Sequence, residues 1–264
     1  MAGRRRKPAA ASALLSVLGS GVLLYAGNSA AIANGEPSTD QQFAAESPWV
    51  VLLVGDDGAP ACTGSLISPR YVLTAAHCAS DGLAVLYGNR SREAARRVAV
   101  REVVRHPNYA GQPHSWDLGL LRLVRPLRVQ PVAVAGRAES WNLLRPGATA
   151  TILGWGATME GSGRPDLLQQ ASFRFTEIGI VGTHITYSTP RGGPCGGDSG
   201  GPLLVTGRDG QPVLVGVASV TDGDLCATGG GMAGYTNVAA LLDFIREHVP
   251  DLPERAPPLD FSHP

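Results

Sequence analysis

Hydrophobic residues gather along the chain in short runs, and residues typical of turns separate these runs. The runs predict buried or half-buried strands at residues 49–54, 71–75, 83–87, 98–104, 118–124, 148–153, 202–205 and 213–220. Helical spacing is clear at 238–249, where five apolar residues form one stripe behind Asn237, a residue suited to a helix cap. The pattern therefore predicts an all-β protein with a C-terminal α-helix.

Composition narrows the class of protein. The 34 Gly and 20 Pro among 264 residues suit strands joined by turns. With 44% hydrophobic and 17% charged residues, the chain is neither disordered nor a membrane bundle. Four of the 22 basic residues lie within residues 1–31, so the remainder holds 18 basic and 22 acidic residues. This balance argues against nucleic acid as a partner.

The first 31 residues have the layout of a secretory signal peptide. A basic stretch at 4–7 precedes an apolar stretch at 9–26, and small residues follow at 29–31. A membrane anchor is the alternative, but serines and glycines make the stretch less apolar than a typical span. We expect an extracellular protein with no membrane attachment after cleavage before Ile32, with Ala31 and Asn34 as competing starts. Residues 250–264, with five prolines, predict an exposed tail.

The four cysteines, Cys62, Cys78, Cys195 and Cys226, would lie in an oxidising compartment. Two disulfides are expected there, and the residues alone leave three possible pairings. The spacing resembles no zinc-binding pattern, and we expect no metal.

Three segments bear residues suited to nucleophilic catalysis: TAAHC at 74–78, WDLGLL at 116–121 and GGDSGGP at 196–202. Together they resemble the chymotrypsin-like, trypsin-fold serine proteases, in that family's order of His, Asp and Ser. Further matches at 32–35, 154–156 and 234–238 extend the resemblance over almost the whole mature chain. The resemblance implies a protease domain over 32–249, made of two antiparallel six-stranded β-barrels divided near 140–147.

The resemblance also assigns catalytic roles, and elementary chemistry explains them. A serine hydroxyl is a weak nucleophile that needs a base, and imidazole, with a pKa near 6.5, suits this task. His77 would be the base, Asp117 would hold its ring, and Ser199 would be the nucleophile. The amides of Gly197 and Ser199 would form the oxyanion hole. Ser219 matches a position that hydrogen-bonds the triad carboxylate.

Substrate preference follows from the same resemblance. Gly193, six residues before the serine, stands where trypsin-like members have an acid, so a buried Arg or Lys side chain would find no partner charge. Thr221 and Ala233 match pocket walls, and Ser219 adjoins them. We expect a preference for small or medium apolar residues before the scissile bond.

The family pattern implies two further pairings. The ammonium of Ile32 would fold inward onto Asp198, beside the nucleophile. Disulfides would join Cys62 to Cys78 and Cys195 to Cys226.

We therefore expect a secreted, monomeric serine endopeptidase without cofactor, acting on proteins or peptides through an acyl-enzyme and open to protein inhibitors. One alternative is an inactive protease-like binding protein, although the chain retains all three triad residues. Another is an α/β-hydrolase esterase, because residues 197–201 also fit G-x-S-x-G, with Asp222 or Asp224 and His248 as partners. That fold needs repeated strand–helix alternation, which the pattern lacks.

Overall fold

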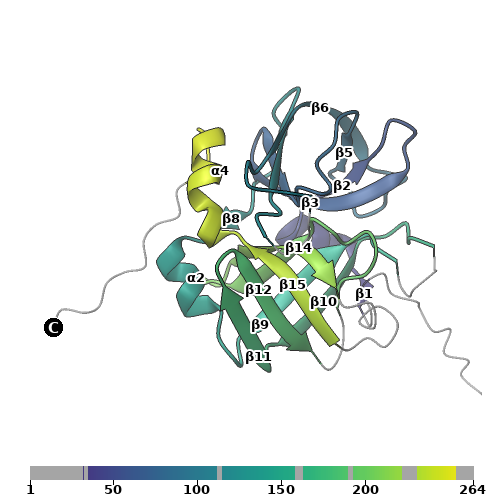
Figure 1. Ribbon diagram of the computed structural model, residues 1–264. Coiled ribbons are helices and arrows are strands. Elements are labelled where there is room, and N and C mark those ends of the chain that lie inside the picture. Colours follow the sequence, from purple (N-terminus) through teal and green to yellow (C-terminus); the bar gives the residue numbers. More distant parts are fainter. Residues whose placement is uncertain are drawn as a thin grey trace, which may run out of the picture.

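The computed structural model describes residues 32, 35–111, 115–157, 163–189, 193–221 and 231–253. These residues form two β units, one above the other in Figure 1. The predicted signal peptide and residues 254–264 of the predicted tail lie outside the described residues. None of the described helices is long and apolar enough to cross a membrane.

The first unit is a closed antiparallel barrel of six strands in the order β2-β3-β4-β7-β6-β5. Closure pairs every strand on both sides and leaves no free sheet edge. The strands are β2 (Val50–Val54), β3 (Pro60–Ser68), β4 (Tyr71–Thr74), β5 (Ala84–Tyr87), β6 (Arg96–Arg105) and β7 (Gly119–Leu123).

The second unit is a nine-stranded sheet in the order β1-β10-β9-β13-β14-β15-β12-β11, with β8 parallel to β14. After the barrel, the chain returns to this sheet through β8 and α2 (Arg137–Leu143), close to the predicted division. Its strands are β1 (Glu36–Pro37), β8 (Ala133–Val134), β9 (Thr149–Gly154), β10 (Gln169–Arg174), β11 (Glu177–Val181), β12 (His184–Thr189), β13 (Pro202–Thr206), β14 (Pro212–Thr221) and β15 (Gly231–Asn237).

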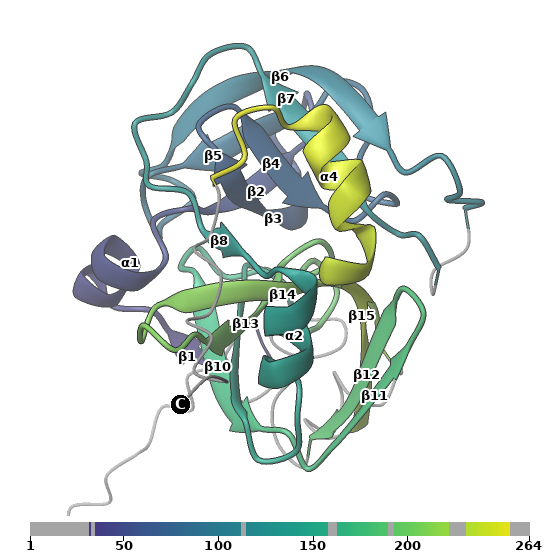
Figure 2. The same ribbon diagram turned by 90° about the vertical axis from the view of Figure 1, so that its left-hand side faces the viewer.

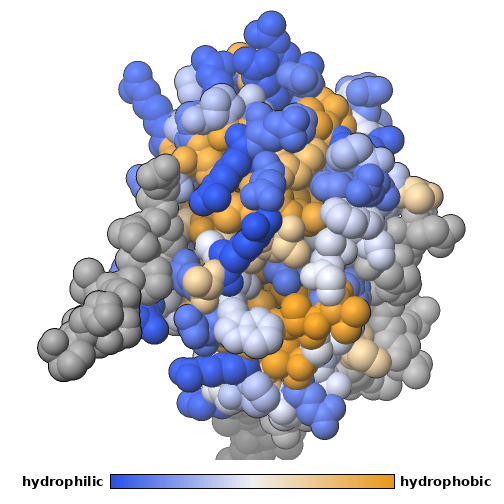
Figure 3. Space-filling view, turned by 60° about the vertical axis from the view of Figure 1, so that its left-hand side comes forward, coloured by the Kyte–Doolittle hydropathy of each residue, from blue (hydrophilic) through white to orange (hydrophobic). Residues whose placement is uncertain are grey.

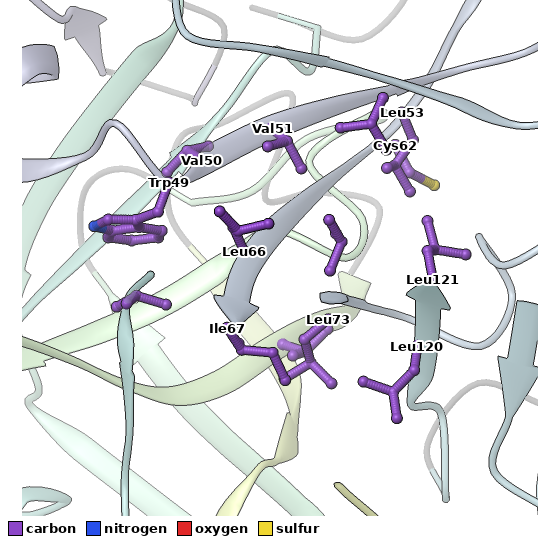
Figure 4. Packing of buried hydrophobic residues seen from close by; sticks show 14 of the residues in the cluster. Trp49, Val50, Val51, Leu53, Cys62, Leu66, Ile67, Leu73, Leu120 and Leu121 are labelled. Carbon is purple, nitrogen blue, oxygen red and sulfur yellow. The ribbon is translucent and has the colours of Figure 1, made fainter. Parts of the chain in front are cut away.

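Buried apolar side chains form two clusters, and the larger one fills the barrel and continues into β9, β13 and β14 of the second unit. In the barrel, apolar side chains including Trp49, Leu66, Leu73 and Leu120 gather in the interior (Figure 4). All five residues of β2 are buried, which explains why this strand is continuously apolar rather than alternating. The core of the sheet includes Phe175, Tyr187 and Tyr235, and the two tyrosine rings lie 5.6 Å apart in a stacked arrangement.

The predicted C-terminal helix is present but shorter than its apolar stripe. A 3₁₀ turn, η1 (Ala239–Leu241), precedes α4 (Leu242–His248). Oδ1 of Asn237 accepts a hydrogen bond from the Ala240 amide at 3.4 Å. The N-cap of α4 is Leu241, which makes no side-chain cap bond, so the predicted cap by Asn237 does not start the α-helix. Although α4 follows the second sheet in sequence, Phe244 and Ile245 are buried in the barrel's core cluster. Figure 2 shows α4 lying beside the barrel.

All eight predicted runs form strands, and the predicted all-β fold with a C-terminal helix is confirmed. The hydrophobic pattern misses β3, β15 and five short or polar strands, and it misses α1 (Asp40–Glu46) and α2. A capping box begins α1, in which the side chains of Thr39 and Gln42 each bond the other's backbone amide. On the face bearing α2 and α4, polar side chains interrupt the apolar surface (Figure 3).

Candidate active site

Strand pairing in the barrel brings His77 and Asp117 together. Thr74, the last residue of β4, pairs with Gly119, the first residue of β7, so the segments beyond both strand ends meet. Nδ1 of His77 lies 2.8 Å from Oδ2 of Asp117, and the His77 amide donates to Oδ1 at 3.0 Å. The two contacts fix the ring against the carboxylate, while 32% of the histidine side chain stays exposed.

The second unit completes the surroundings of Asp117, which is fully buried. Oγ of Ser219 in β14 donates to Oδ2 of Asp117 at 2.6 Å, and Oγ1 of Thr236 in β15 donates to its main-chain oxygen at 2.9 Å. Burial on its own would raise the pKa of Asp117, but the hydrogen bonds from His77 and Ser219 outweigh it and hold that pKa below its usual range. The carboxylate therefore stays charged beside the imidazole.

Trp116, the residue before Asp117, has a backbone conformation that the sequence does not reveal. Its φ is 59°, in the left-handed region that bulky side chains rarely adopt. Its ring stacks on His106 with centroids 4.7 Å apart, and His106 in turn contacts Phe244 of α4. This packing holds the strained backbone, and such strain often occurs at functional sites. The sequence assigns no catalytic role to His106, and this packing makes it a buried structural residue.

Residues 196–202, which include Ser199 and are called the nucleophile segment, are attached to the barrel. The Thr63 amide in β3 donates to the main-chain oxygen of Ser199 at 2.9 Å, and Oγ1 of Thr63 donates to that of Gly197 at 3.2 Å. Gly200 has a φ of +78°, and a Cβ there would lie 2.0 Å from Oγ1 of Thr74. A glycine is therefore needed where this segment passes the barrel.

Asp198 is a buried acid on the same segment. Its Oδ1 accepts from the Gly156 amide at 2.8 Å, and its Oδ2 accepts from the Cys195 amide at 2.9 Å. Its carboxyl occupies space where Cβ atoms on Gly154 and Gly156 would clash. Burial raises the pKa of Asp198 to about 7, although the two amides and the charge of Arg164 oppose the shift. Ile32, the predicted partner, is fully buried in the core of the second unit.

The predicted pocket residues lie on or near the paired strands β14 and β15. Thr221 and Ala233 are Cα partners in that pairing, and Ser219 lies two residues before Thr221. Ala233 is fully buried, and Gly193 is buried near the nucleophile segment. Backbone pairing thus brings the two predicted wall positions side by side, whereas the Thr221 side chain lies outside the described part.

The predicted disulfide between Cys62 and Cys78 is confirmed, with Cα atoms 6.1 Å apart. It ties β3 to the segment that bears His77. Cys195 is also disulfide-bonded, but its predicted partner, Cys226, lies outside the described residues.

Among the described residues, one group of metal-ligand type gathers closely: Cys62, His77 and Cys78. Both sulfurs are committed to the disulfide and cannot act as thiolate ligands, so this group does not form a metal site.

Comparison with known proteins agrees with this geometry. The family model described as Trypsin matches residues 32–245. The chain is similar to a trypsin of Saccharopolyspora erythraea, with 31% identity over 83% of this chain and 98% of that protein. It is also similar to human kallikrein-14, with 33% identity over 77% of this chain and 80% of the relative. Rat transmembrane protease serine 9 is 31% identical over 77% of this chain and 21% of its own length.

Proposed function

The chain belongs to the trypsin family of serine endopeptidases, and from this premise we propose that it cleaves peptide bonds through Ser199, His77 and Asp117. The observation that carries the proposal is the His77–Asp117 pair, with its 2.8 Å contact between Nδ1 and Oδ2. Because the carboxylate engages Nδ1, the other ring nitrogen, Nε2, is the one available as a base.

The proposed reaction has two steps. Nε2 of His77 takes the hydroxyl proton as Ser199 Oγ attacks the substrate carbonyl, and the amides of Gly197 and Ser199 stabilise the oxyanion. The C–N bond then breaks, the leaving amine receives the proton from His77, and an acyl ester remains on Ser199. Water, deprotonated by His77, cleaves this ester and restores the free serine.

A fluorophosphonate, which phosphonylates activated serines, tests the assignment. Mass mapping of the labelled protein should find the adduct on Ser199, and Ser199→Ala and His77→Ala should both abolish labelling. Labelling of another residue, or activity that a chelator removes and Ser199→Ala does not, would refute the triad.

We further propose that the active enzyme is secreted and begins at Ile32. The buried Asp198 carboxyl supports this, because an unpaired charge in such a place is costly and an inward-folded ammonium would balance it. N-terminal sequencing of secreted, active protein tests the start, and a fully active chain that begins at Asn34 would contradict it.

The pocket residues support a preference for small or medium apolar side chains before the scissile bond. Gly193 offers no charge to a bound cation, and Ala233, the strand partner of Thr221, would narrow the pocket. Profiling with a peptide library should show this preference, and a strong preference for Arg or Lys would contradict it. We expect a monomer that protein protease inhibitors can block.

A further inference from the structure

A cation lies directly against the nucleophile segment. The guanidinium carbon and Nε of Arg164 are each 2.7 Å from the place where a Cβ on Gly197 would be. Gly197 precedes Ser199 by two residues, so this charge lies close to the reacting atoms. Nη1 of Arg164 donates to the main-chain oxygen of Pro60, the first residue of β3. Arg164 therefore spans from the nucleophile segment of the second unit to the barrel.

A second arginine, Arg92, lies on a segment that pairs with the one bearing Arg164. The Ser91–Leu167 bridge and a hydrogen bond from the Arg92 amide to the Asp166 oxygen at 3.0 Å join the two segments. Nε of Arg92 is buried and has no hydrogen-bond partner among the described residues. The charge of Arg92 is close enough to lower the pKa of Arg164, adding to the larger effect of burial.

No described carboxylate forms an ion pair with either arginine. Asp198 attracts Arg164 electrostatically, but among the described residues its oxygens accept from the Gly156 and Cys195 amides and form no ion pair with the guanidinium. A half-buried guanidinium is suited to a carboxylate, because its planar fork can donate two parallel hydrogen bonds. The shared positive charge of the two arginines therefore attracts an anionic group, such as a substrate carboxylate.

The location indicates which part of a substrate would meet this charge. The predicted pocket, which takes the side chain before the scissile bond, is built on β14 and β15. The Gly200 amide donates to Ala218 in β14, whereas Thr63 in β3 donates to Ser199 and Gly197, so the nucleophile segment lies between these two strands. Arg164 donates to Pro60, which is in β3 two residues before Cys62, and is therefore on the β3 side of the segment. A peptide that crosses Ser199 from the pocket would place its leaving-group residues there.

We propose that Arg164, assisted by Arg92, forms a carboxylate-binding subsite that favours substrates with Asp or Glu among the first two residues after the scissile bond. The proposal rests on the proposed endopeptidase function. Arg164 would act as a specificity residue, since it binds a substrate side chain without taking part in bond cleavage. The favoured substrate would combine a small apolar residue before the bond with an acidic residue after it.

Paired peptides test this subsite. Two internally quenched peptides would share one apolar acyl half and differ by Asp or Asn at the second residue after the scissile bond, with a second pair varied at the first. Because charge-assisted bonds are strong, we expect kcat/KM to be about tenfold higher for the Asp member of one pair at low salt. Added salt should reduce this ratio.

Variants separate recognition from a structural role. Arg164→Gln should bring the Asp-to-Asn ratio close to one, Arg164→Lys should keep part of it, and Arg92→Gln should lower it to a smaller extent. Arg208→Gln is the matched control, because Arg208 lies in the turn between β13 and β14, at the end of β13 far from Ser199. If Arg164 only balances the charge of Asp198, its loss would slow both peptides equally and leave the ratio unchanged.

The outcomes are distinguishable from failure of the proposed function. Equal rates on Asp and Asn peptides by an enzyme that cleaves both, or a ratio that survives Arg164→Gln, would overturn the subsite alone. No cleavage of any peptide together with no fluorophosphonate labelling would overturn the endopeptidase assignment.

Discussion

The two β units contribute to the candidate site in different ways. The barrel provides His77 and Asp117, and contacts between neighbouring strand ends fix them at 2.8 Å. The second unit provides Ser199 on a segment whose neighbour, Asp198, is a buried acid with a pKa raised to about 7. The base half, His77 and Asp117, is thus held by strand pairing and by hydrogen bonds that stabilise the charged Asp117. The nucleophile half, the segment around Ser199, includes a buried carboxyl whose charge needs a partner. We infer that activation acts on the second half.

The largest expected effect comes from variants that abolish the catalytic reaction, to which both halves contribute. Ser199→Ala should lower kcat by about 10⁴- to 10⁶-fold, and His77→Ala should lower it about as much, because the triad acts as a unit. The double variant should be scarcely slower than either single one. Kinetics on a cleavable peptide measure this, with unfolding curves as a control for folding. Additive losses would indicate that the two residues act independently.

The next largest effect is a difference in the free energy of unfolding between chains with and without the residues before Ile32. In a Ser199→Ala chain that retains residues before Ile32, the folded pKa of Asp198, about 7, lies above its ordinary value of 3.8. The unfolded chain therefore loses this proton first, and the free energy of unfolding should fall as pH rises from about 4 to 7, by up to about 4 kcal/mol. Denaturant titrations at several pH values measure the fall.

Two controls sharpen that measurement. Asp198→Asn removes the titrating group, so the corresponding fall should disappear. A chain that begins at Ile32 should also resist the fall, because its ammonium would balance the carboxylate. Equal pH dependence in the longer and the Ile32 chains would argue against the pairing.

A smaller effect concerns the bond between the two units at Asp117. Ser219→Ala removes one of the hydrogen bonds that keep the pKa of Asp117 low. We expect kcat/KM to fall by about tenfold, and we expect the loss of activity on acidification to begin at a higher pH than in the unaltered enzyme. Ser172→Ala is a matched control, because its hydroxyl bonds Thr151 on an exposed part of the sheet. A pH profile identical to that of the unaltered enzyme would contradict this role.

The smallest expected effect lies where α4 packs on the barrel. Burial, with a lesser contribution from the charge of His248, lowers the pKa of His106 below its ordinary 6.5. The folded state therefore resists protonation, and stability should fall as pH drops below 6.5. The variant His106→Phe keeps an aromatic ring and should weaken this dependence in thermal unfolding. An unchanged dependence would show that other groups cause it.

The two units also differ in how far sequence predicts them. The barrel strands β2, β4, β5 and β7 are apolar runs that local pattern finds. In the second unit, β12 (HITYST) and β15 (GMAGYTN) contain mostly polar or small residues, and their pairing with each other sets their structure. Local pattern therefore misses them.

The same division holds within the site. Short segments reveal His77, Asp117 and Ser199, because each lies in a distinctive local sequence. The strained φ of Trp116 and the contact of Arg164 with Gly197 depend on packing between distant segments. Neither has a local signal, and so only the folded chain reveals them.

The most direct test of the difference between the halves is the rate at which a fluorophosphonate labels Ser199 in two folded chains. One chain begins at Ile32 and the other at Asn34, and unfolding curves confirm that both are folded. We expect the Ile32 chain to react at least about a hundredfold faster, since a buried carboxylate without its partner costs several kcal/mol and would disorder the nucleophile segment. Equal labelling rates would contradict the claim that the Ile32 ammonium completes the site.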